Sequence, residues 1–380
     1  MLRAMAKQRI RVGVIGCGLI AQVMHLPHLR ELSEEFEIAA LCDLSRGTLD
    51  AVADAYDVAH RSTRWEDLLE GSVDAVLVLT PGSHAPPAIA AAQAGLHVFV
   101  EKPMSISVPE GRDMVAAAAD AGVRLMVGYM KRYDPAYERL AELLPTLGRV
   151  PLVRFTTLEA PLQPYVSHLR LVRHDDVPAD TITELNEDDR RRTEAVIGGD
   201  ADPVVRAAYR EILLDSMIHE LNALRGLLGE PDRLEFASIR KEGVSAVLRF
   251  GDTQCIALWV DLPGLPRYEQ DWSFYAPSAR ASLTFPSPFL RNAPTMLVLE
   301  EGGAGPAGSR RVEELVSYDE AFRRELLEFH GSITEGRPPR TDGTDALRDL
   351  ALCRSIVEAH RSGVAIEQPT SDSEVVRTKP

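Results

Sequence analysis

The N-terminal third of the chain alternates short apolar runs with segments whose apolar residues recur at helical spacing. The apolar runs are "RIRVGVIG", "FEIAALCD", "VDAVLVLTP", "LHVFVEKP" and "VRLMVGYM". Runs that are almost continuously apolar are typical of parallel strands covered on both faces. Helical patterns such as "LIAQVMHLPHLREL" and "VPEGRDMVAAAADAG" lie between them. The pattern therefore predicts a doubly wound α/β domain of the Rossmann type over residues 1–133.

The pattern changes after "DPAYERLAELLPTLG" to longer β-prone runs with turn residues between them, such as "VPLVRFTTLEA" and "SAVLRFGDTQCIALWVDL". This predicts a second, α+β domain over residues 134–380 with an open, mainly antiparallel sheet. In "QCIALWV" both alternating sets of side chains are apolar. We therefore expect helices to cover one face of that strand and a second subunit to cover the other. Two helices at about 319–362 are expected to close the domain.

A charged segment, residues 162–210, interrupts the second domain. It contains "RHDDVPAD" and "NEDDRRRTEAVIGGDAD" and is too polar to supply core. We interpret it as an inserted lid or a surface excursion.

Charge and cysteine usage exclude several classes of partner. Lys and Arg total 42 against 57 Asp and Glu, a net charge of −15, so the field of the molecule would repel nucleic acid and anionic membranes. No apolar run is long enough to cross a membrane, and the four cysteines form no metal-binding or disulfide pattern. We expect a cytoplasmic protein that binds neither nucleic acid nor membrane.

A glycine-rich turn follows the first apolar run. In "VIGCGLIA", Gly16 permits a tight turn and Gly18 a close approach of pyrophosphate, with Leu19 and Ile20 opening a helix. Asp43 ends the second strand at the spacing expected for a carboxylate that binds ribose hydroxyls. Asp43 favours NAD, because it would repel a 2′-phosphate. Arg46 leaves NADP possible, although a solvated arginine is the alternative interpretation.

Polar residues follow the later strands, at the edge where such sheets bind ligands. Thr80, Pro81 and His84 follow the fourth strand and either contact the cofactor or only cap the next helix. Glu101 and Lys102 follow the fifth and are expected to contact the cofactor, and Lys102 is one of only five lysines in the chain. The proline after it restricts Lys102, which is placed for proton transfer or substrate orientation; a surface lysine is the alternative. The sixth strand leads to residues that either bind polar substrate or form a solvated basic turn: Lys131, Arg132 and Tyr133.

These motifs together resemble the glucose-fructose oxidoreductase, inositol dehydrogenase and MocA family (Gfo/Idh/MocA). The resemblance rests on "GVIGCGLIA", "AGLHVFVEKPMS", "GYMKRYDPAY", "DSMIHELNALRGLLGEP" and "TEGRPPRTDGTDALRDLALCRSIVEAHRSG", in the family's order over about residues 9–365. It implies that Lys102 is the central active-site residue, that Asp215 and His219 complete the site, and that the second sheet supports homodimers or homotetramers. The segment before Asp215 departs from the family's usual pattern, which puts substrate preference in doubt.

The helix around Asp215 and His219 is compatible with that role. Leu213, Met217 and Leu221 fall on one face, and Asp215, His219 and Asn222 form a polar stripe on nearly the opposite face. A polar stripe is usually only solvated, but Asp215 one turn earlier could orient the imidazole of His219. A metal pair is a third interpretation; no further ligand stands at a recognisable spacing, so we expect no metal.

The resemblance implies an NAD(P)-dependent dehydrogenase that moves a hydride between nicotinamide and a secondary alcohol or ketone of a sugar, sugar derivative or cyclitol. Two alternatives remain. One is an imine or other carbonyl reductase of the same family. The other is a non-catalytic, dinucleotide-binding regulatory protein, in which Lys102 and His219 would be dispensable.

Overall fold

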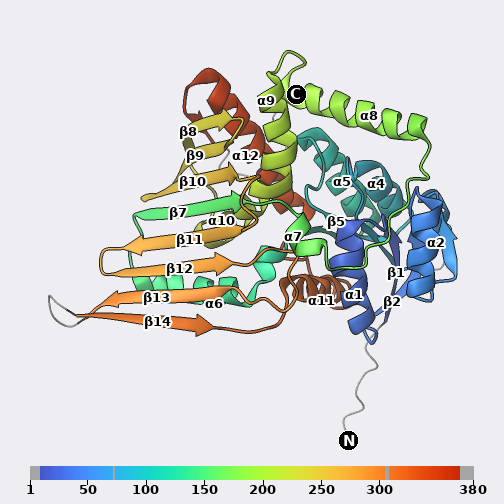
Figure 1. Ribbon diagram of the computed structural model, residues 1–380, viewed down its shortest axis with the longest axis horizontal. Helices are drawn as coiled ribbons and strands as arrows, with labels where there is room; N and C mark the ends of the chain where they lie inside the picture. Colours follow the sequence, from blue (N-terminus) through green and yellow to red (C-terminus); the bar gives the residue numbers. More distant parts are fainter. Residues whose placement is uncertain (1–8, 72, 304–307, 369–380) are drawn as a thin grey trace, which may run out of the picture. The chain divides into compact units, whose positions relative to one another are not determined.

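The computed structural model describes residues 9–71, 73–303 and 308–368. The chain forms two compact units that interleave along the sequence (Figure 1). The first unit consists of Met1–Gly128, Arg170–Thr193 and Phe322–Leu347, and the second of Tyr129–Leu169, Glu194–Ala321 and Arg348–Pro380. The sequence predicted two domains that meet at a single boundary after residue 133, whereas each of these units contains three segments of the chain. The predicted boundary between folding domains stays a prediction.

The first unit is built on a six-stranded sheet whose neighbouring strands all run parallel. The strand order is β3-β2-β1-β4-β5-β6. Its strands are β1 (Ile10–Ile15), β2 (Phe36–Cys42), β3 (His60–Ser62), β4 (Ala75–Val78), β5 (His97–Glu101) and β6 (Leu125–Gly128). The order reverses between β1 and β4, so the carboxyl ends of these two strands flank the switch point at which such sheets bind ligands. The predicted doubly wound α/β fold is confirmed.

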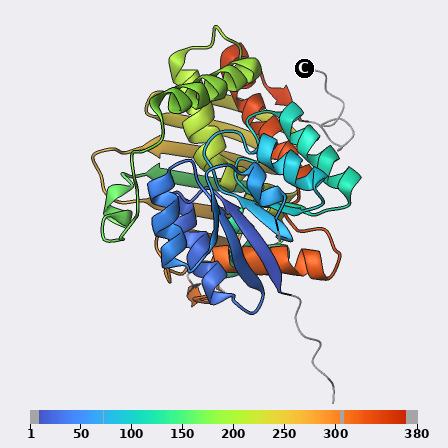
Figure 2. The same cartoon turned by 90° about the vertical axis from the view of Figure 1, so that its right-hand side faces the viewer.

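Helices cover both faces of this sheet. The connections between parallel strands are right-handed, and they run in opposite directions on the two sides of the switch point. Helices α1 and α2 therefore lie on one face of the sheet, and α4 and α5 lie on the other. Figure 2 shows the first pair in blue and the second in cyan. The helices of this unit are η1 (Ala21–His25), α1 (Leu26–Glu31), α2 (Arg46–Ala55), α3 (Glu66–Leu69), α4 (Ala85–Gln93), α5 (Val108–Ala121) and α11 (Ala321–Thr334). Ser45 and Ser107 cap α2 and α5 by accepting a hydrogen bond from a backbone N–H in the first turn.

The second unit is built on a nine-stranded sheet in the order β14-β13-β12-β11-β7-β10-β9-β8-β15. Neighbouring strands are antiparallel except for β7 and β10. The strands are β7 (Leu152–Glu159), β8 (Arg233–Arg240), β9 (Gly243–Phe250), β10 (Thr253–Asp261), β11 (Glu269–Ala276), β12 (Ala279–Phe285), β13 (Met296–Gly302), β14 (Ser309–Leu315) and β15 (Ile366–Glu367). The predicted open, mainly antiparallel sheet is confirmed.

Strand β10 shows how the two faces of that sheet differ. Cys255, Ala257 and Trp259 are buried, whereas Ile256 is 41% and Leu258 36% exposed. Ile256 pairs with Val247 on β9, which pairs with Phe236 on β8, so an apolar stripe crosses three strands on the uncovered face. Within the part of the chain that the structure describes, only the face of the strand that carries Trp259 is covered. Covering of the other face by a second subunit stays a prediction.

The remaining helices include those of the charged segment. They are η2 (Met130–Tyr133), α6 (Pro135–Leu143), η3 (Leu144–Leu147), α7 (Gln163–Val166), α8 (Ala179–Ile197), α9 (Pro203–Ala207), η4 (Ala208–Met217), α10 (Ile218–Leu228) and α12 (Gly343–Ser362). The long polar helix α8 is largely exposed and buries Thr193 and Ile197 near its end. Helices α11 and α12 confirm the expected C-terminal pair. Among the helices of the described ranges, none combines the length and apolar character needed to cross a membrane.

Candidate active site

The glycine turn after β1 has the geometry of a phosphate-binding loop. Gly16 has φ +99°, and a Cβ there would lie 3.0 Å from the carbonyl carbon of Leu79, so this position requires glycine. A Cβ on Gly18 would meet no atom of the described residues within 4 Å, which leaves open space above the backbone for a ligand. Leu19 and Ile20 are partly exposed and open the helix, and Ala21 is fully buried. The turn therefore presents the N-terminus of a helix to an incoming anion.

Asp43 joins this turn to the end of β2. Its Oδ2 accepts a hydrogen bond from the backbone N–H of Cys17 at 2.8 Å, and its Oδ1 accepts one from Ser45 at 2.8 Å. Each carboxylate oxygen keeps a further lone pair, so the group is held in place and can still accept from ribose hydroxyls. Arg46 donates to Asp50 one turn along α2, at 2.8 Å, and so its guanidinium is engaged on the helix surface.

The loop after β4 is tied to the loop after β5 by His84. This side chain is 2% exposed, with Nδ1 2.8 Å from the carbonyl oxygen of Pro103 and Nε2 2.6 Å from that of Thr80. Burial lowers the pKa of His84, although both carbonyl oxygens favour its charged form. The ring thus positions two loops. Cofactor contact by His84, the partly exposed Thr80 and the exposed Pro81 stays a prediction.

The end of β5 separates the roles of Glu101 and Lys102. Glu101 is 6% exposed; its Oε1 lies 2.7 Å from Nε2 of His25, and its Oε2 accepts from the backbone N–H of Lys102 at 3.0 Å. The carboxylate therefore anchors the turn to the helix behind the glycine loop. Lys102 is partly exposed at the carboxyl edge of the sheet. Direct cofactor contact by either residue stays a prediction.

Behind this turn lies a buried acid that the sequence did not indicate, Glu325 of α11. It is 0% exposed, and neither carboxylate oxygen has a hydrogen-bond partner among residues 9–71, 73–303 and 308–368. Burial and the nearby charge of Glu101 raise the pKa of Glu325 well above its usual value, which favours the neutral form of this carboxyl. Ligand atoms of His25, Glu101 and Glu325 lie within 4.8 Å of one another. A tetrahedral zinc separates its ligands by about 3.3 Å, and the 2.7 Å between His25 and Glu101 fits a hydrogen bond better.

In the second unit, Asp215 and His219 lie where a π-helix, η4, passes into α10. Asp215 is exposed and His219 partly exposed, and the His219 ring stands edge-on to Tyr129 with centroids 6.2 Å apart. Short π-helical stretches occur frequently at functional sites. The third residue of the predicted polar stripe, Asn222, is fully buried and donates to Asp349 at 2.8 Å, so the stripe is not solvated along its whole length.

The basic turn after β6 is buried within the second unit. Lys131 is 6% exposed, and its amine lies 3.2 Å from a carboxylate oxygen of Glu220 and 2.5 Å from the amide oxygen of Gln270. Gln270 in turn donates to Glu220 and, at 3.1 Å, to Thr157. Arg132 donates to a backbone carbonyl at 3.3 Å, and Tyr133 is 2% exposed. These contacts give the turn a structural role, and substrate binding by Lys131, Arg132 and Tyr133 stays a prediction.

Known proteins share this combination of fold and motifs. The family described as "Oxidoreductase family, NAD-binding Rossmann fold" matches residues 10–129. D-xylose 1-dehydrogenase (NADP(+)) 2 of Haloferax volcanii is 27% identical over 376 residues, which cover 93% of this chain and 98% of that enzyme. Inositol 2-dehydrogenase 3 of Saccharopolyspora erythraea is 33% identical over 185 residues, covering 47% of this chain and about half (54%) of that enzyme.

The fold likeness extends over the whole length of solved structures. A putative NADPH-dependent oxidoreductase of Desulfitobacterium hafniense superposes with a TM-score of 0.76 at 17% identity, covering 97% of this chain and 99% of that one. The chain belongs to the Gfo/Idh/MocA family of oxidoreductases. It is accordingly an NAD(P)-binding protein, and the glycine turn and Asp43 fit that cofactor.

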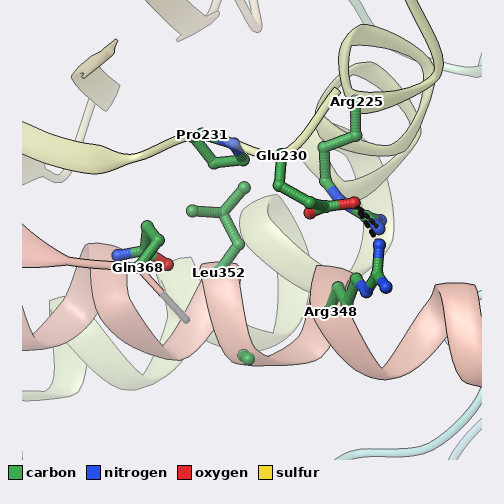
Figure 3. Close-up of a pocket in the computed structure, with 7 residues that line it drawn as sticks. Arg225, Glu230, Pro231, Arg348, Leu352 and Gln368 are labelled. Atoms are coloured by element: carbon green, nitrogen blue, oxygen red, sulfur yellow. Dashed lines mark hydrogen bonds and ion pairs between the residues drawn. The ribbon is translucent and has the colours of Figure 1, made fainter. Parts of the chain in front are cut away.

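In this Gfo/Idh/MocA protein, buried and partly buried ion pairs brace the far end of α10. Glu230 accepts from Arg225 at 2.7 and 2.8 Å and from Arg348 at 2.6 Å, around the small pocket drawn in Figure 3. Arg225 also donates to Asp349 at 2.5 Å. The charges that line this pocket are thus paired with one another, and the cluster fixes the helix that carries His219.

Proposed function

We propose that the protein is a dehydrogenase that exchanges a hydride between a nicotinamide cofactor and a secondary alcohol or ketone of a sugar, sugar derivative or cyclitol. The observation that carries this proposal is the shared sheet edge: the open glycine turn, the anchored Asp43 and the Glu101–Lys102 turn all follow strands of one parallel sheet. The xylose and inositol dehydrogenases among its relatives support the substrate class.

We propose Lys102, Asp215 and His219 as the catalytic group. Removal of a hydride from a carbinol carbon requires that the hydroxyl proton leave and that negative charge on the oxygen be stabilised. A lysine amine and an imidazole supply a positive charge and a proton acceptor, and Asp215 would orient the imidazole of His219. The nicotinamide supplies the hydride-accepting carbon when the cofactor is bound.

NAD is the proposed cofactor. Asp43 would accept hydrogen bonds from the ribose hydroxyls, and Gly16 and Gly18 would admit the pyrophosphate to the helix N-terminus. Arg46, the cation nearest in sequence that could accommodate a 2′-phosphate, pairs with Asp50. A cytoplasmic location is proposed from the acidic charge and the cysteine pattern, in agreement with four buried, free cysteines.

We propose that the uncovered face of the second sheet forms a homodimer or homotetramer. The stripe of Phe236, Val247, Ile256 and Leu258 is apolar, and large exposed apolar patches mark association surfaces. Sedimentation of the wild-type chain beside Ile256→Arg tests this. A variant that sediments as a monomer while its wild type does not is the expected result, and a monomeric wild type would remove the proposal.

The function is tested by incubating the protein with NAD or NADP and a panel of aldoses, inositols and their keto forms, while nicotinamide absorbance is followed at 340 nm. Turnover of at least one polyol or sugar is expected, and Lys102→Met should lower it by about 10³-fold. Turnover only of imines, included in the same panel, would favour the reductase alternative. No turnover, together with tight dinucleotide binding that Lys102→Met leaves unchanged, would favour the non-catalytic regulatory protein.

A further inference from the structure

We infer that Asp176, a carboxylate in the charged insert, occupies the place a 2′-phosphate would need and so makes the protein select NAD(H) over NADP(H). The inference rests on the proposed role of Asp43 as the ribose-binding carboxylate. It adds a selectivity residue from a segment that lies 133 positions further along the chain and belongs to the first compact unit.

The insert docks along the starts of the two helices that follow β1 and β2 (Figure 1). Gln22, just after the glycine turn, donates to the carbonyl of Val172 and accepts from its N–H, both at 2.8 Å. The N–H of His174 donates to Thr48 of α2 at 3.0 Å. A Cβ on Gly47 would lie 2.7 Å from the His174 ring, so the segment packs directly on the first turn of α2.

Asp176 fills the N-terminus of that helix. Its Oδ2 accepts from the backbone N–H of Gly47 at 2.7 Å, and its Oδ1 accepts from the hydroxyl of Ser45. These two hydrogen bonds lower the pKa of Asp176, so the group carries its negative charge at neutral pH. Helix α2 is ten residues long, and the N–H groups of its first turn favour an anion. The carboxylate of Asp176 supplies that anion from within the protein.

The same turn is where a 2′-phosphate would arrive. Ser45 joins the two carboxylates, because its N–H donates to Asp43 and its hydroxyl to Asp176. A phosphate on the hydroxyl that Asp43 binds would lie beside Ser45 and Gly47, and it would need their donors. Those donors already serve Asp176, and two negative charges face the phosphate, which itself carries about −1.5 to −2. Arg46 offers no compensation while it pairs with Asp50.

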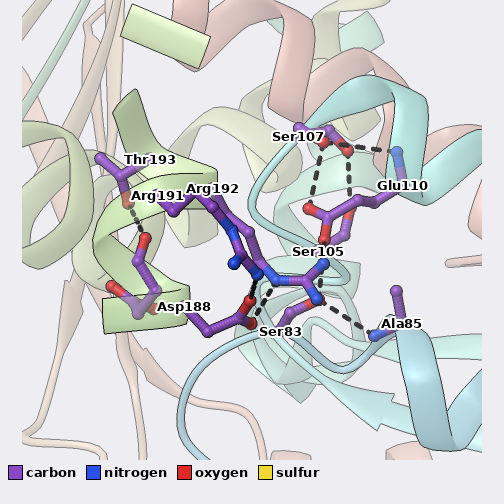
Figure 4. Close-up of polar contacts among 10 residues, drawn as sticks. Ser83, Ala85, Ser105, Ser107, Glu110, Asp188, Arg191, Arg192 and Thr193 are labelled. Atoms are coloured by element: carbon purple, nitrogen blue, oxygen red, sulfur yellow. Dashed lines mark hydrogen bonds and ion pairs between the residues drawn. The ribbon is translucent and has the colours of Figure 1, made fainter. Parts of the chain in front are cut away.

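A second anchor holds the insert further along, as Figure 4 shows. Arg192 of α8 pairs with Glu110 in the first turn of α5 and with Asp188 on its own helix. Glu110 also accepts from Ser83 at 3.1 Å and from Ser107 at 3.0 Å. The insert is thus fixed at the starts of α2 and α5, on opposite faces of the parallel sheet, and Asp176 is held in place by more than its own two hydrogen bonds.

The test is fluorescence titration of the full-length protein with NADH and with NADPH, without substrate. Asp176→Asn removes the charge and keeps the shape, whereas Asp176→Ala also frees the donors of Ser45 and Gly47. Asp175→Asn is the matched control, because it removes the same charge from the neighbouring residue. The Asp175 carboxylate is exposed, and its Oδ1 lies 3.7 Å from Nε of Arg173. We expect wild type to bind NADH more tightly. The NADPH affinity should rise in the order wild type, Asn and Ala variants, by about tenfold overall at low salt, with NADH changed less than twofold.

The inference would be overturned if wild type bound NADH and NADPH with equal affinity, or if the ratio of NADPH to NADH affinity in Asp176→Ala stayed within twofold of the wild-type ratio. An equal gain of NADPH affinity in Asp175→Asn would also overturn it. A fall of both affinities in Asp176→Ala would show that the residue only caps α2, and would also overturn it. Binding of neither nucleotide to the wild type would instead contradict the dinucleotide site itself. Turnover plays no part in the titration, so failure of the proposed reaction is distinguished from failure of this inference.

Discussion

Two lysines follow neighbouring strands of the parallel sheet and have opposite environments. Lys102 comes directly after β5 and is partly exposed, on a turn that Glu101 and His25 hold from behind. Lys131 comes three residues after β6 and is buried, with its amine on Glu220 and Gln270. A lysine after a strand of such a sheet is therefore not in itself evidence of chemistry. Whether such a lysine stabilises the interior depends on which acidic side chains lie next to it in the fold.

The largest effect is expected at the partly exposed lysine. Lys102→Met should lower kcat/KM by about 10³-fold, because proton transfer and charge stabilisation at the reacting oxygen would be lost. Its urea unfolding curve should match that of wild type. Lys241→Met, at an exposed turn, is the control and should retain full activity. If Lys102→Met kept more than half of wild-type activity, Lys102 would not be catalytic.

At the buried lysine the expected loss is in stability. Lys131→Met should lower the free energy of unfolding by about 3–5 kcal/mol, since it leaves the carboxylate of Glu220 buried without its cation. Adding Glu220→Gln should recover most of that loss, because the double variant buries no unpaired charge. Urea denaturation of the two single variants and the double variant measures this. If the losses of the single variants simply add, the ion pair does not stabilise the second unit.

A second buried acid, Glu325, can be compared with Glu220, which pairs with Lys131. The pKa of Glu325 is raised in the folded chain, so its contribution to stability is fully present below the unfolded pKa of about 4.5 and is lost as pH rises toward the folded pKa. Glu325→Gln has no proton to lose. The variant should therefore gain on wild type above pH 5, by up to about 1.4 kcal/mol per pH unit. If the free energies of unfolding of wild type and variant change in parallel from pH 5 to 8, folding does not raise the pKa of Glu325.

The features that sequence could predict are those fixed by local chemistry. Continuous apolar runs indicated the parallel strands, and Gly16 with Asp43 indicated the nucleotide turn, because a positive φ and a strand-end carboxylate have local signatures. Strand β10 shows the limit of such signatures. Its two alternating apolar sets look alike in sequence, yet only the set with Trp259 is covered by this chain.

The errors and omissions concern partners that are distant in the chain. Asn222 looked solvated because its acceptor, Asp349, lies 127 residues away. Glu325 gave no signal because its closeness to Glu101 depends on the packing of α11. Asp176 looked like one charge in a polar segment until the fold placed it on α2. The periodicity of a sequence indicates on which face of a helix or strand a side chain lies. It does not indicate which distant residue packs against that face.

The most direct test of the central claim is a double-mutant cycle on kcat/KM with a substrate from the panel, using Lys102→Met and His219→Gln. If both side chains act on one substrate oxygen, each single variant should lose about 10²- to 10³-fold. The double variant should then lose little more than the worse single one, as residues that act as a unit do. Losses that multiply in the double variant, or a single variant with wild-type kcat/KM, would contradict the proposed catalytic group.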